Sequence, residues 1–266
     1  LKPANYTFPL VTVTGTENLM MAAALTEGTS VFRNCAREPE VVDLAVLLRA
    51  MGADVEGDGT GVIRITGRKE LGGAAHPVIP DRVEAGTYLM AGALIGRRLE
   101  VAGCRPEDLK AVLGLLESAG VPLEVGDRSV VVSRPDRLSA VDVSTEPHPG
   151  FPTDMQAQYM TLATQARGVS RITENIFESR FMHVSELRRM GATINIEGRT
   201  AEVQGPATLA GAQVMATDLR ASASLVLAGL VAEGVTVIDR VYHLDRGYEP
   251  MEIKLEELGA SVERIR

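Results

Sequence analysis

The stretch 47–52, LLRAMG, closes an apolar helical segment with a glycine, and three later stretches of the chain repeat this ending. They are 115–120 (LLESAG), 187–191 (LRRMG) and 255–259 (LEELG). The four glycines follow one another at intervals of about 70 residues, and such a period indicates several copies of one supersecondary unit. A glycine in this place is typical of the residue that follows a helix C-terminus. A copy whose sequence differs from the others is a candidate location for catalytic residues.

Between these endings the pattern predicts hairpins, apolar helices and short strands. Alternating β-branched residues around Gly or Asp turns predict three hairpins: 54–56 with 62–66, 123–125 with 129–133, and 193–196 with 201–204. Helices rich in Ala, Gly, Ser, Met and Leu are expected at 83–95, 155–166 and 220–231, with a partial fourth at 19–25. Because these helices carry few charges, they belong in an interior rather than on a surface.

Buried helices surrounded by hairpins, repeated about a pseudo-threefold axis, predict an α/β fold. We expect a solid α/β domain made of repeated βαβ-type units around a buried helical bundle. Three copies complete one domain at residues 80–266, and residues 1–79 form part of a second domain. The stretch 72–80, with two glycines and two prolines, is the expected hinge.

Composition excludes several classes of protein. The 266 residues carry a formal net charge of −8, which argues against non-specific binding to nucleic acid or to an anionic membrane. Two cysteines are too few for a disulfide framework and fit a cytosolic protein. No apolar run approaches the roughly 20 residues that span a bilayer. The four histidines show no metal-ligand spacing, and no nucleotide-cofactor motif is present, so we expect neither a metal nor a cofactor.

An aspartate stands before each apolar helix of the larger domain, at positions 81, 154 and 218. Each could be a helix N-cap, which stabilises a helix by about 1 kcal/mol. The second copy is different, because its approach, EPHPGFPTDMQAQ at 146–158, contains three prolines. A carboxylate held on so stiff a loop suits a general base, and Asp154 is the candidate.

Three arginines occupy parallel positions near helix starts: Arg180, Arg220 and Arg246. Each has an acidic neighbour, so local ion pairs are one interpretation. If the copies are related by a threefold axis, however, equivalent positions meet at one end of the domain. Convergent guanidinium groups form a site for a carboxylate or a phosphate.

Cys104 precedes a predicted helix, where a thiol pKa can fall. The alternative, which we favour, is a buried small residue that closes a strand.

Five runs of the sequence resemble UDP-N-acetylglucosamine enolpyruvyl transferases, the MurA family: 36–43, 151–158, 178–184, 213–224 and 245–249. The likeness extends over the whole chain. It implies a cytosolic enzyme that transfers the enolpyruvyl group of phosphoenolpyruvate to the 3-hydroxyl of UDP-N-acetylglucosamine and releases phosphate. That reaction is the first committed step of peptidoglycan synthesis. The implied fold is two inside-out α/β barrels with the active site between them.

The resemblance also implies residue roles. Catalytic roles fall to Asp154, Asp218 and Arg246. Substrate contacts fall to Val11, Thr12, Val13, Asp154, Ile176, Arg180, Arg220 and Arg246. Within this set, Asp154 faces the sugar 3-hydroxyl as its base, and the arginines face phosphoenolpyruvate or stabilise the closed cleft. Ile176 contacts the nucleotide sugar, and residues 11–13 hold the uridine diphosphate through their main chain.

The chain also departs from the family pattern. A Lys-Asn pair and a mobile loop with a reactive cysteine belong to a stretch of roughly 150 residues that precedes position 1 in the family. We therefore expect a C-terminal fragment that is inactive without this part. Two alternatives stay open: a transferase acting on shikimate 3-phosphate, and a non-catalytic module that binds the UDP-sugar.

Overall fold

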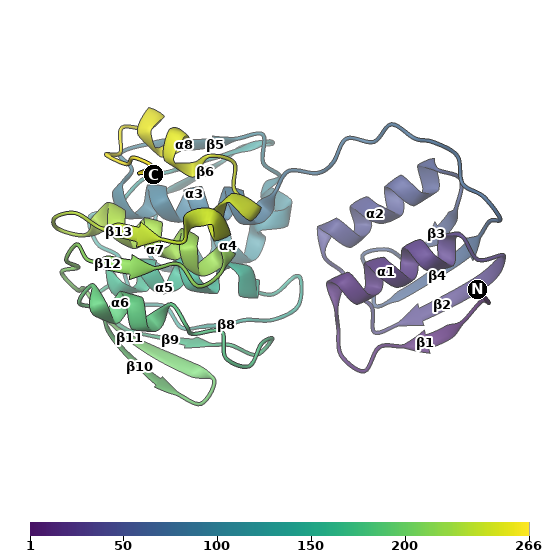
Figure 1. The fold of residues 1–266 in the computed structure, drawn as a ribbon, viewed down its shortest axis with the longest axis horizontal. Coiled ribbons are helices and arrows are strands. Elements are labelled where there is room, and N and C mark those ends of the chain that lie inside the picture. Colours follow the sequence, from purple (N-terminus) through teal and green to yellow (C-terminus); the bar gives the residue numbers. More distant parts are fainter. Residues whose placement is uncertain (266) are drawn as a thin grey trace. The chain divides into compact units, whose positions relative to one another are not determined.

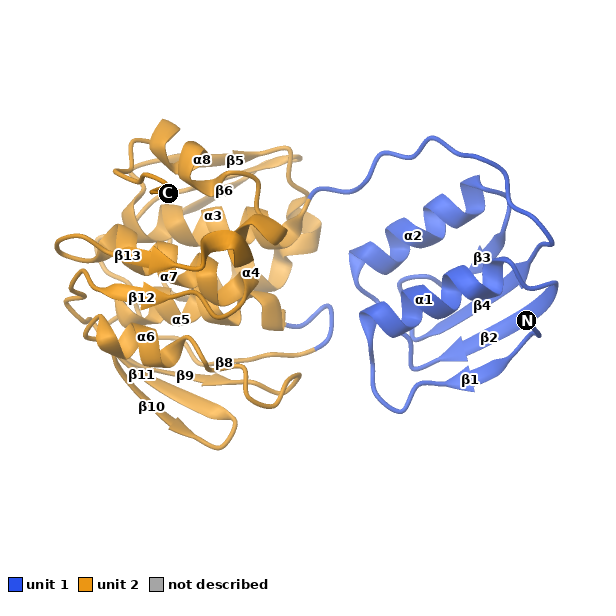
Figure 2. Cartoon of the chain, viewed as in Figure 1, with its two compact units in different colours: residues 1–80, 147–150 blue, residues 81–146, 151–266 orange. Residues whose placement is uncertain are grey.

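The computed structural model describes residues 1–265, which divide into two compact units (Figure 2). Unit 1 consists of Leu1–Pro80 together with Pro147–Gly150. Unit 2 consists of Asp81–Glu146 and the chain from Phe151 onward. The grouping of Pro147–Gly150 with unit 1 is not foreseen by the sequence analysis, and it lies just before the candidate base in the chain.

Unit 1 is a four-stranded sheet covered by two helices, α1 (Val13–Ala24) and α2 (Pro39–Ala50) (Figure 1). The strand order is β1-β2-β4-β3, with bounds Asn5–Thr7, Gly28–Arg33, Val62–Gly67 and Asp54–Glu56 respectively. β1 pairs with β2 in parallel, and the other pairs are antiparallel. Met20 of α1 and Ile63 and Ile65 of β4 are fully buried in its core.

Helix α1 begins earlier than the sequence predicts. The expected segment started at residue 19, whereas α1 starts at Val13 with Thr12 as its N-cap. The Thr12 hydroxyl accepts a hydrogen bond from the backbone N–H of Gly15 at 3.2 Å. Threonines and a glycine have poor helix propensity, so the first turn gives no helical signal in the sequence. The cap and the packing of α1 on the sheet outweigh that propensity.

Three helices form the interior of unit 2: α3 (Arg82–Ile95), α5 (Gln156–Thr164) and α7 (Leu219–Val231) (Figure 1). All three contact one another, and every residue of α5 is buried. The prediction of apolar interior helices is therefore confirmed. Small residues allow the close approach: a Cβ added at Gly86 of α3 would lie 2.9 Å from the Met155 side chain.

Sheets lie outside these helices, as the pattern predicts (Figure 1). One has the order β5-β7-β6, a second β10-β11-β9-β8, and a third pairs β12 with β13 in parallel. The nine strands of these sheets have the bounds Leu99–Ala102 (β5), Leu123–Val125 (β6), Ser129–Val132 (β7), Val143–Ser144 (β8), Gly168–Thr173 (β9), Thr193–Glu197 (β10), Thr200–Gly205 (β11), Gln213–Met215 (β12) and Val237–Asp239 (β13). The described strands thus form separate sheets around a helical interior and not one continuous closed barrel.

The remaining helices close the repeats. They are α4 (Lys110–Ser118), α6 (Val184–Arg189) and α8 (Met251–Glu257), preceded by the 3₁₀ turns η1 (Pro106–Leu109) and η3 (Val241–Arg246), while a further turn, η2 (Thr153–Met155), precedes α5. The glycines that end the four copies, at 52, 120, 191 and 259, all have positive φ, between 84° and 104°. This left-handed conformation favours glycine, which explains the sequence period. No helix within residues 1–265 is long and apolar enough to cross a membrane.

Candidate active site

The three aspartates that precede the interior helices have different partners. Asp81 caps α3 by accepting two backbone N–H groups of its first turn, at 2.7 and 3.0 Å. Asp218 caps α7 in the same way, with both distances 2.9 Å. Asp154 caps no helix, because it lies inside the turn η2 and its carboxylate points to other side chains. The repeat in which three prolines precede the aspartate is therefore also the repeat whose aspartate does not cap a helix.

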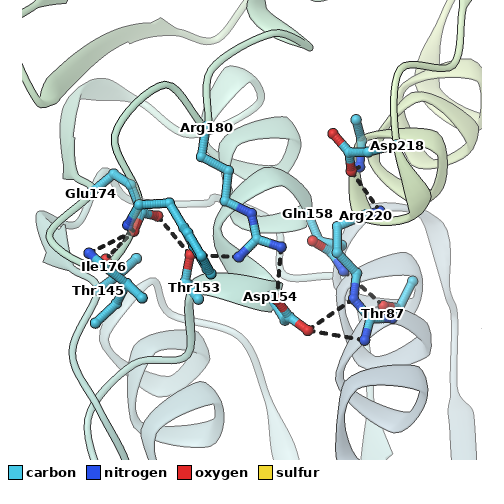
Figure 3. A network of polar contacts seen from close by, with 12 residues as sticks. Thr87, Thr145, Thr153, Asp154, Gln158, Glu174, Ile176, Arg180, Asp218 and Arg220 are labelled. Atoms are coloured by element: carbon cyan, nitrogen blue, oxygen red, sulfur yellow. Dashed lines mark hydrogen bonds and ion pairs between the residues drawn. The ribbon is translucent and has the colours of Figure 1, made fainter. Parts of the chain in front are cut away.

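Two arginines share the Asp154 carboxylate (Figure 3). Arg180, in the loop before α6, donates from Nη2 to Oδ1 at 2.7 Å. Arg220, in the first turn of α7, donates from Nε and Nη2 to Oδ2 at 3.2 and 3.0 Å. The fold thus brings together three of the predicted residues from distant parts of the sequence.

Both arginines act on the charge of Asp154. Partial burial raises the pKa of this carboxyl, but Arg220 and Arg180 oppose burial and hold the pKa below its usual value. Asp154 is therefore ionised at neutral pH. One nitrogen of Arg220, Nη1, is buried and has no hydrogen-bond partner among the described residues.

Arg220 rests on a polar cluster between the interior helices. Its guanidinium carbon lies 5.7 Å from the centre of the Tyr248 ring. The Tyr248 hydroxyl is 2.9 Å from Oγ1 of Thr87 on α3 and accepts from Nε2 of Gln158 on α5 at 3.4 Å. Burial raises the pKa of Tyr248, so its hydroxyl stays protonated. The sequence analysis does not single out Tyr248, Thr87 or Gln158, because a polar residue inside an apolar helix, or a tyrosine in the bend between η3 and α8, carries no motif.

The loop between β9 and α6 carries Ile176, Phe177 and Arg180. Ile176 and Phe177 are exposed, at 37% and 54% of their full area. The guanidinium carbon of Arg180 lies 5.0 Å from the centre of the Phe177 ring. Ser179 has a φ of 128°, a backbone conformation that residues other than glycine rarely adopt and that costs on the order of 1 kcal/mol or more. The backbone immediately before Arg180 is thus strained.

Other predicted residues have no described hydrogen bond or ion pair with this carboxylate. Arg246 is exposed at the end of η3, and within the described residues no hydrogen bond or ion pair joins it to Asp154 or to Arg220. Its neighbour Asp245 pairs with Arg264 at 2.6 Å. Residues 11–13 belong to unit 1, where Thr12 caps α1 and Val13 begins it.

His183, beside α6, is buried, and the sequence analysis counts it only among the four histidines without metal-ligand spacing. Burial lowers its pKa to about 4, Asp218 raises it in part, and Arg180 lowers it further. The imidazole is neutral at pH 7, and its Nε2 is buried with no partner among the described residues. It lies in the field of both Asp218 and Arg180, which carry opposite charges.

Cys104 is buried, and its thiol donates to the backbone carbonyl of Val101 at 3.4 Å. Burial raises the pKa of the thiol, which opposes formation of a nucleophilic thiolate. This geometry fits the interpretation as a small residue that closes β5. Within residues 1–265, no three His, Cys, Asp or Glu side chains gather closely enough to hold a metal ion.

Comparison with known proteins gives a consistent result. Residues 1–255 match the family model described as EPSP synthase (3-phosphoshikimate 1-carboxyvinyltransferase). UDP-N-acetylglucosamine 1-carboxyvinyltransferases from Koribacter versatilis and Xylella fastidiosa (strain 9a5c) are 59% and 57% identical to the chain over its full length. The chain spans 61% and 63% of those two relatives. The resemblance stated from the sequence is confirmed.

Solved structures share the fold. The enolpyruvyl transferase NikO from Streptomyces tendae superposes with a TM-score of 0.92 at 28% identity, over 98% of this chain and 65% of that chain. An EPSP synthase from Acinetobacter baumannii superposes with a TM-score of 0.76 at 18% identity, over 99% of this chain and 64% of that chain. The predicted α/β fold class, with its interior helices, is confirmed.

Proposed function

We propose that this chain is the part of a transferase that carries Asp154 and the arginines Arg180 and Arg220. The chain belongs to the EPSP synthase (3-phosphoshikimate 1-carboxyvinyltransferase) family. The acceptor is UDP-N-acetylglucosamine and the donor is phosphoenolpyruvate. This choice follows the relatives that are 56–59% identical, all of which are named for that acceptor. The shikimate enzymes of solved structure are 18% identical and support the fold alone. The reaction would be the first committed step of peptidoglycan synthesis and would take place in the cytosol.

The observation that carries the proposal is the carboxylate of Asp154 held between Arg180 and Arg220. An ionised carboxylate can accept the proton of a sugar hydroxyl that comes within hydrogen-bond distance. Guanidinium groups bind the phosphate and carboxylate of phosphoenolpyruvate, often through two parallel hydrogen bonds. The site therefore offers a base for one substrate beside cations for the other.

The arginines also control the strength of this base. While both guanidinium groups contact Asp154, its lowered pKa makes it a weak proton acceptor. When they turn to the anionic donor substrate, they leave the carboxylate and its basicity increases. Binding of phosphoenolpyruvate thus activates the base that the acceptor hydroxyl needs.

The reaction is an addition followed by an elimination. Asp154 takes the proton of the 3-hydroxyl, and the oxygen forms a bond to C2 of phosphoenolpyruvate while a donor outside these residues protonates the methylene carbon. A proton then leaves the new methyl group, the double bond re-forms, and phosphate departs with the electrons of its C–O bond. Arg180 and Arg220 stabilise the charge of the departing phosphate, an effect that depends on donors fixed beforehand.

The remaining predicted residues take catalytic or substrate-binding roles in this proposal. Asp218 and Arg246 complete the reacting centre, and Asp218 fixes the start of the helix that carries Arg220. The main chain of residues 11–13 would hold the uridine diphosphate, and Ile176 would contact the sugar.

The test joins residues 1–266 to the part of the Koribacter versatilis relative that the chain does not span. Phosphate release is measured with both substrates, with Asp154→Ala, and with Asp81→Ala as the matched control from a sister repeat. We expect Asp154→Ala to lose about 100-fold or more in turnover, as for loss of a general base, and Asp81→Ala to retain activity. Release with shikimate 3-phosphate in place of the UDP-sugar would contradict the proposal.

The non-catalytic alternative is tested on the 266 residues alone. Titration calorimetry with UDP-N-acetylglucosamine shows whether this part binds the sugar nucleotide, and Asp154→Ala shows whether the site takes part. Turnover by the 266 residues at the rate of the joined protein would contradict our expectation that they are inactive by themselves.

A further inference from the structure

A buried carboxylate that the sequence analysis does not single out lies beside the candidate site. Glu174, directly after β9, is 1% exposed. Its Oε1 accepts hydrogen bonds from the backbone N–H groups of Ile176 and Phe177 at 2.9 and 3.0 Å. The same oxygen accepts from the Thr145 hydroxyl at 2.9 Å, and Oε2 accepts from the Thr153 hydroxyl at 2.9 Å. Because a buried charge is costly unless it is hydrogen-bonded, these four donors are held firmly.

The Thr153 hydroxyl links Glu174 to Arg180, because it hydrogen-bonds with both side chains (Figure 3). A threonine hydroxyl has one proton to donate, and an ionised carboxylate can only accept. The proton of Thr153 is therefore directed to Glu174, which leaves the oxygen lone pairs for Nη1 of Arg180 at 2.6 Å. The other terminal nitrogen of Arg180 reaches Asp154 at 2.7 Å. Two acceptors thus fix the guanidinium plane, and Glu174 orients one of them.

We propose that Glu174 is a positioning residue: it orients the Thr153 hydroxyl, and through it holds Arg180 against Asp154. The same carboxylate fixes the backbone at Ile176, so one buried charge sets both the anion-binding arginine and the loop that would contact the sugar. The catalytic consequence rests on the proposed function. The hydrogen-bond relay itself does not.

Glu174→Gln changes the chemistry of the relay with almost no change of shape. Three donors meet at Oε1, so the amide oxygen must stay there and the amide NH₂ must face Thr153. The Thr153 hydroxyl then accepts from this NH₂, and its own proton no longer has the carboxylate as its acceptor. That proton competes with Nη1 of Arg180 for the space around the oxygen. We expect Arg180 to lose its anchor on Thr153.

The readout is the NMR signal of each guanidinium group in the 266-residue chain near neutral pH. A guanidinium held by two acceptors rotates slowly and gives resolved NH₂ signals. We expect Glu174→Gln to broaden or shift the Arg180 signals and to leave those of Arg220, which has its own contacts with Asp154 and Tyr248. Glu186→Gln is the matched control, because this buried carboxylate also accepts a backbone N–H, at 3.1 Å, but has no contact with the relay.

A role confined to stability would give a different result. It would lower the melting temperature in Glu174→Gln and in Glu186→Gln without affecting Arg180 selectively. Arg180 signals that are unchanged in a folded Glu174→Gln chain would overturn the proposal. If that variant does not fold, Thr153→Val decides, because it removes only the bridging hydroxyl; unchanged Arg180 signals there would also overturn it.

A kinetic measurement in the joined protein links the relay to the reaction. Glu174→Gln should lower kcat/KM for phosphate release about 10-fold, because small misplacement of a binding group is costly, and Glu186→Gln should not. If the joined protein has no activity at all, the proposed function fails while the NMR result still decides the relay.

Discussion

The starts of helices α3 and α7 differ from the start of α5, although the same residue type stands before each. The carboxylates of Asp81 and Asp218 accept hydrogen bonds from backbone N–H groups, whereas the carboxylate of Asp154 pairs with two guanidinium groups. The first two arrangements are local and stabilise a helix. The third needs side chains from three separate segments. In a repeated fold, a residue that caps a helix in two copies but not in the third is free in that third copy to form part of a site.

A short 3₁₀ turn causes the difference. In η2, Asp154 is two residues beyond the N-cap Pro152, and its carboxylate accepts from side chains and not from backbone N–H groups of the turn. Pro152 precedes this turn in extended conformation, and Glu174 holds Thr153 beside it. The α5 copy therefore replaces a cap by contacts from neighbouring elements.

Replacing Asp154 is expected to have the largest effect on stability. Asp154→Asn leaves two partly buried guanidinium groups facing each other without a carboxylate. Removal of one partner from a fully buried pair costs about 3–5 kcal/mol, and because Asp154 is 36% exposed we expect about 2 kcal/mol here. Denaturant unfolding of wild type and variant measures this. A variant as stable as wild type would mean that the arginines do not depend on the carboxylate.

The next effect is a pH dependence from His183, which lies in the field of both Asp218 and Arg180. Its pKa is about 4 when folded and about 6.5 when unfolded, so the unfolded chain binds more protons between these values. Stability is therefore full above pH 6.5 and falls as the pH decreases toward 4. We expect a loss of about 1.5 kcal/mol between pH 7 and pH 5. His183→Gln should flatten this dependence, and an equal slope in the variant would refute the assignment.

How much of this could be predicted from the sequence depends on the range of each interaction. The apolar interior helices and the glycine endings follow from local patterns and appear in the structure as expected. The early start of α1 at Val13 does not, because a cap and sheet packing outweigh weak propensity. At the site, Asp154 was suspected because its loop departs from the sister copies.

The supporting residues of the site are of another kind. Glu174, Thr153 and Tyr248 act through contacts between segments that are distant in sequence, and no spacing rule identifies them. A buried carboxylate with four donors is visible only once the strands and the loop are assembled. The predictions on Asp81 and Asp218, by contrast, need only their own helices.

Alanine at either capping position should cost less than the loss of Asp154. Asp218→Ala and Asp81→Ala each leave two N–H groups of a first turn without their acceptor, and we expect a loss of about 1 kcal/mol for each. Asp218→Ala should also weaken the joined protein's activity, since α7 carries Arg220, whereas Asp81→Ala should not. Equal effects of both on phosphate release would show that the α7 cap has no special link to the site.

The smallest effect is expected from asparagine at the caps, and it gives the comparison its sharpest form. An asparagine oxygen accepts the same backbone N–H bonds, so Asp81→Asn should change stability by only about 0.3 kcal/mol. Asp154→Asn is the same chemical change, but its partners are cations that an amide cannot neutralise. Unfolding of the two variants under identical conditions therefore separates a residue kept for its geometry from one kept for its charge. If Asp81→Asn cost as much as Asp154→Asn, charge would matter equally in both copies, and the distinction between cap and site would fail.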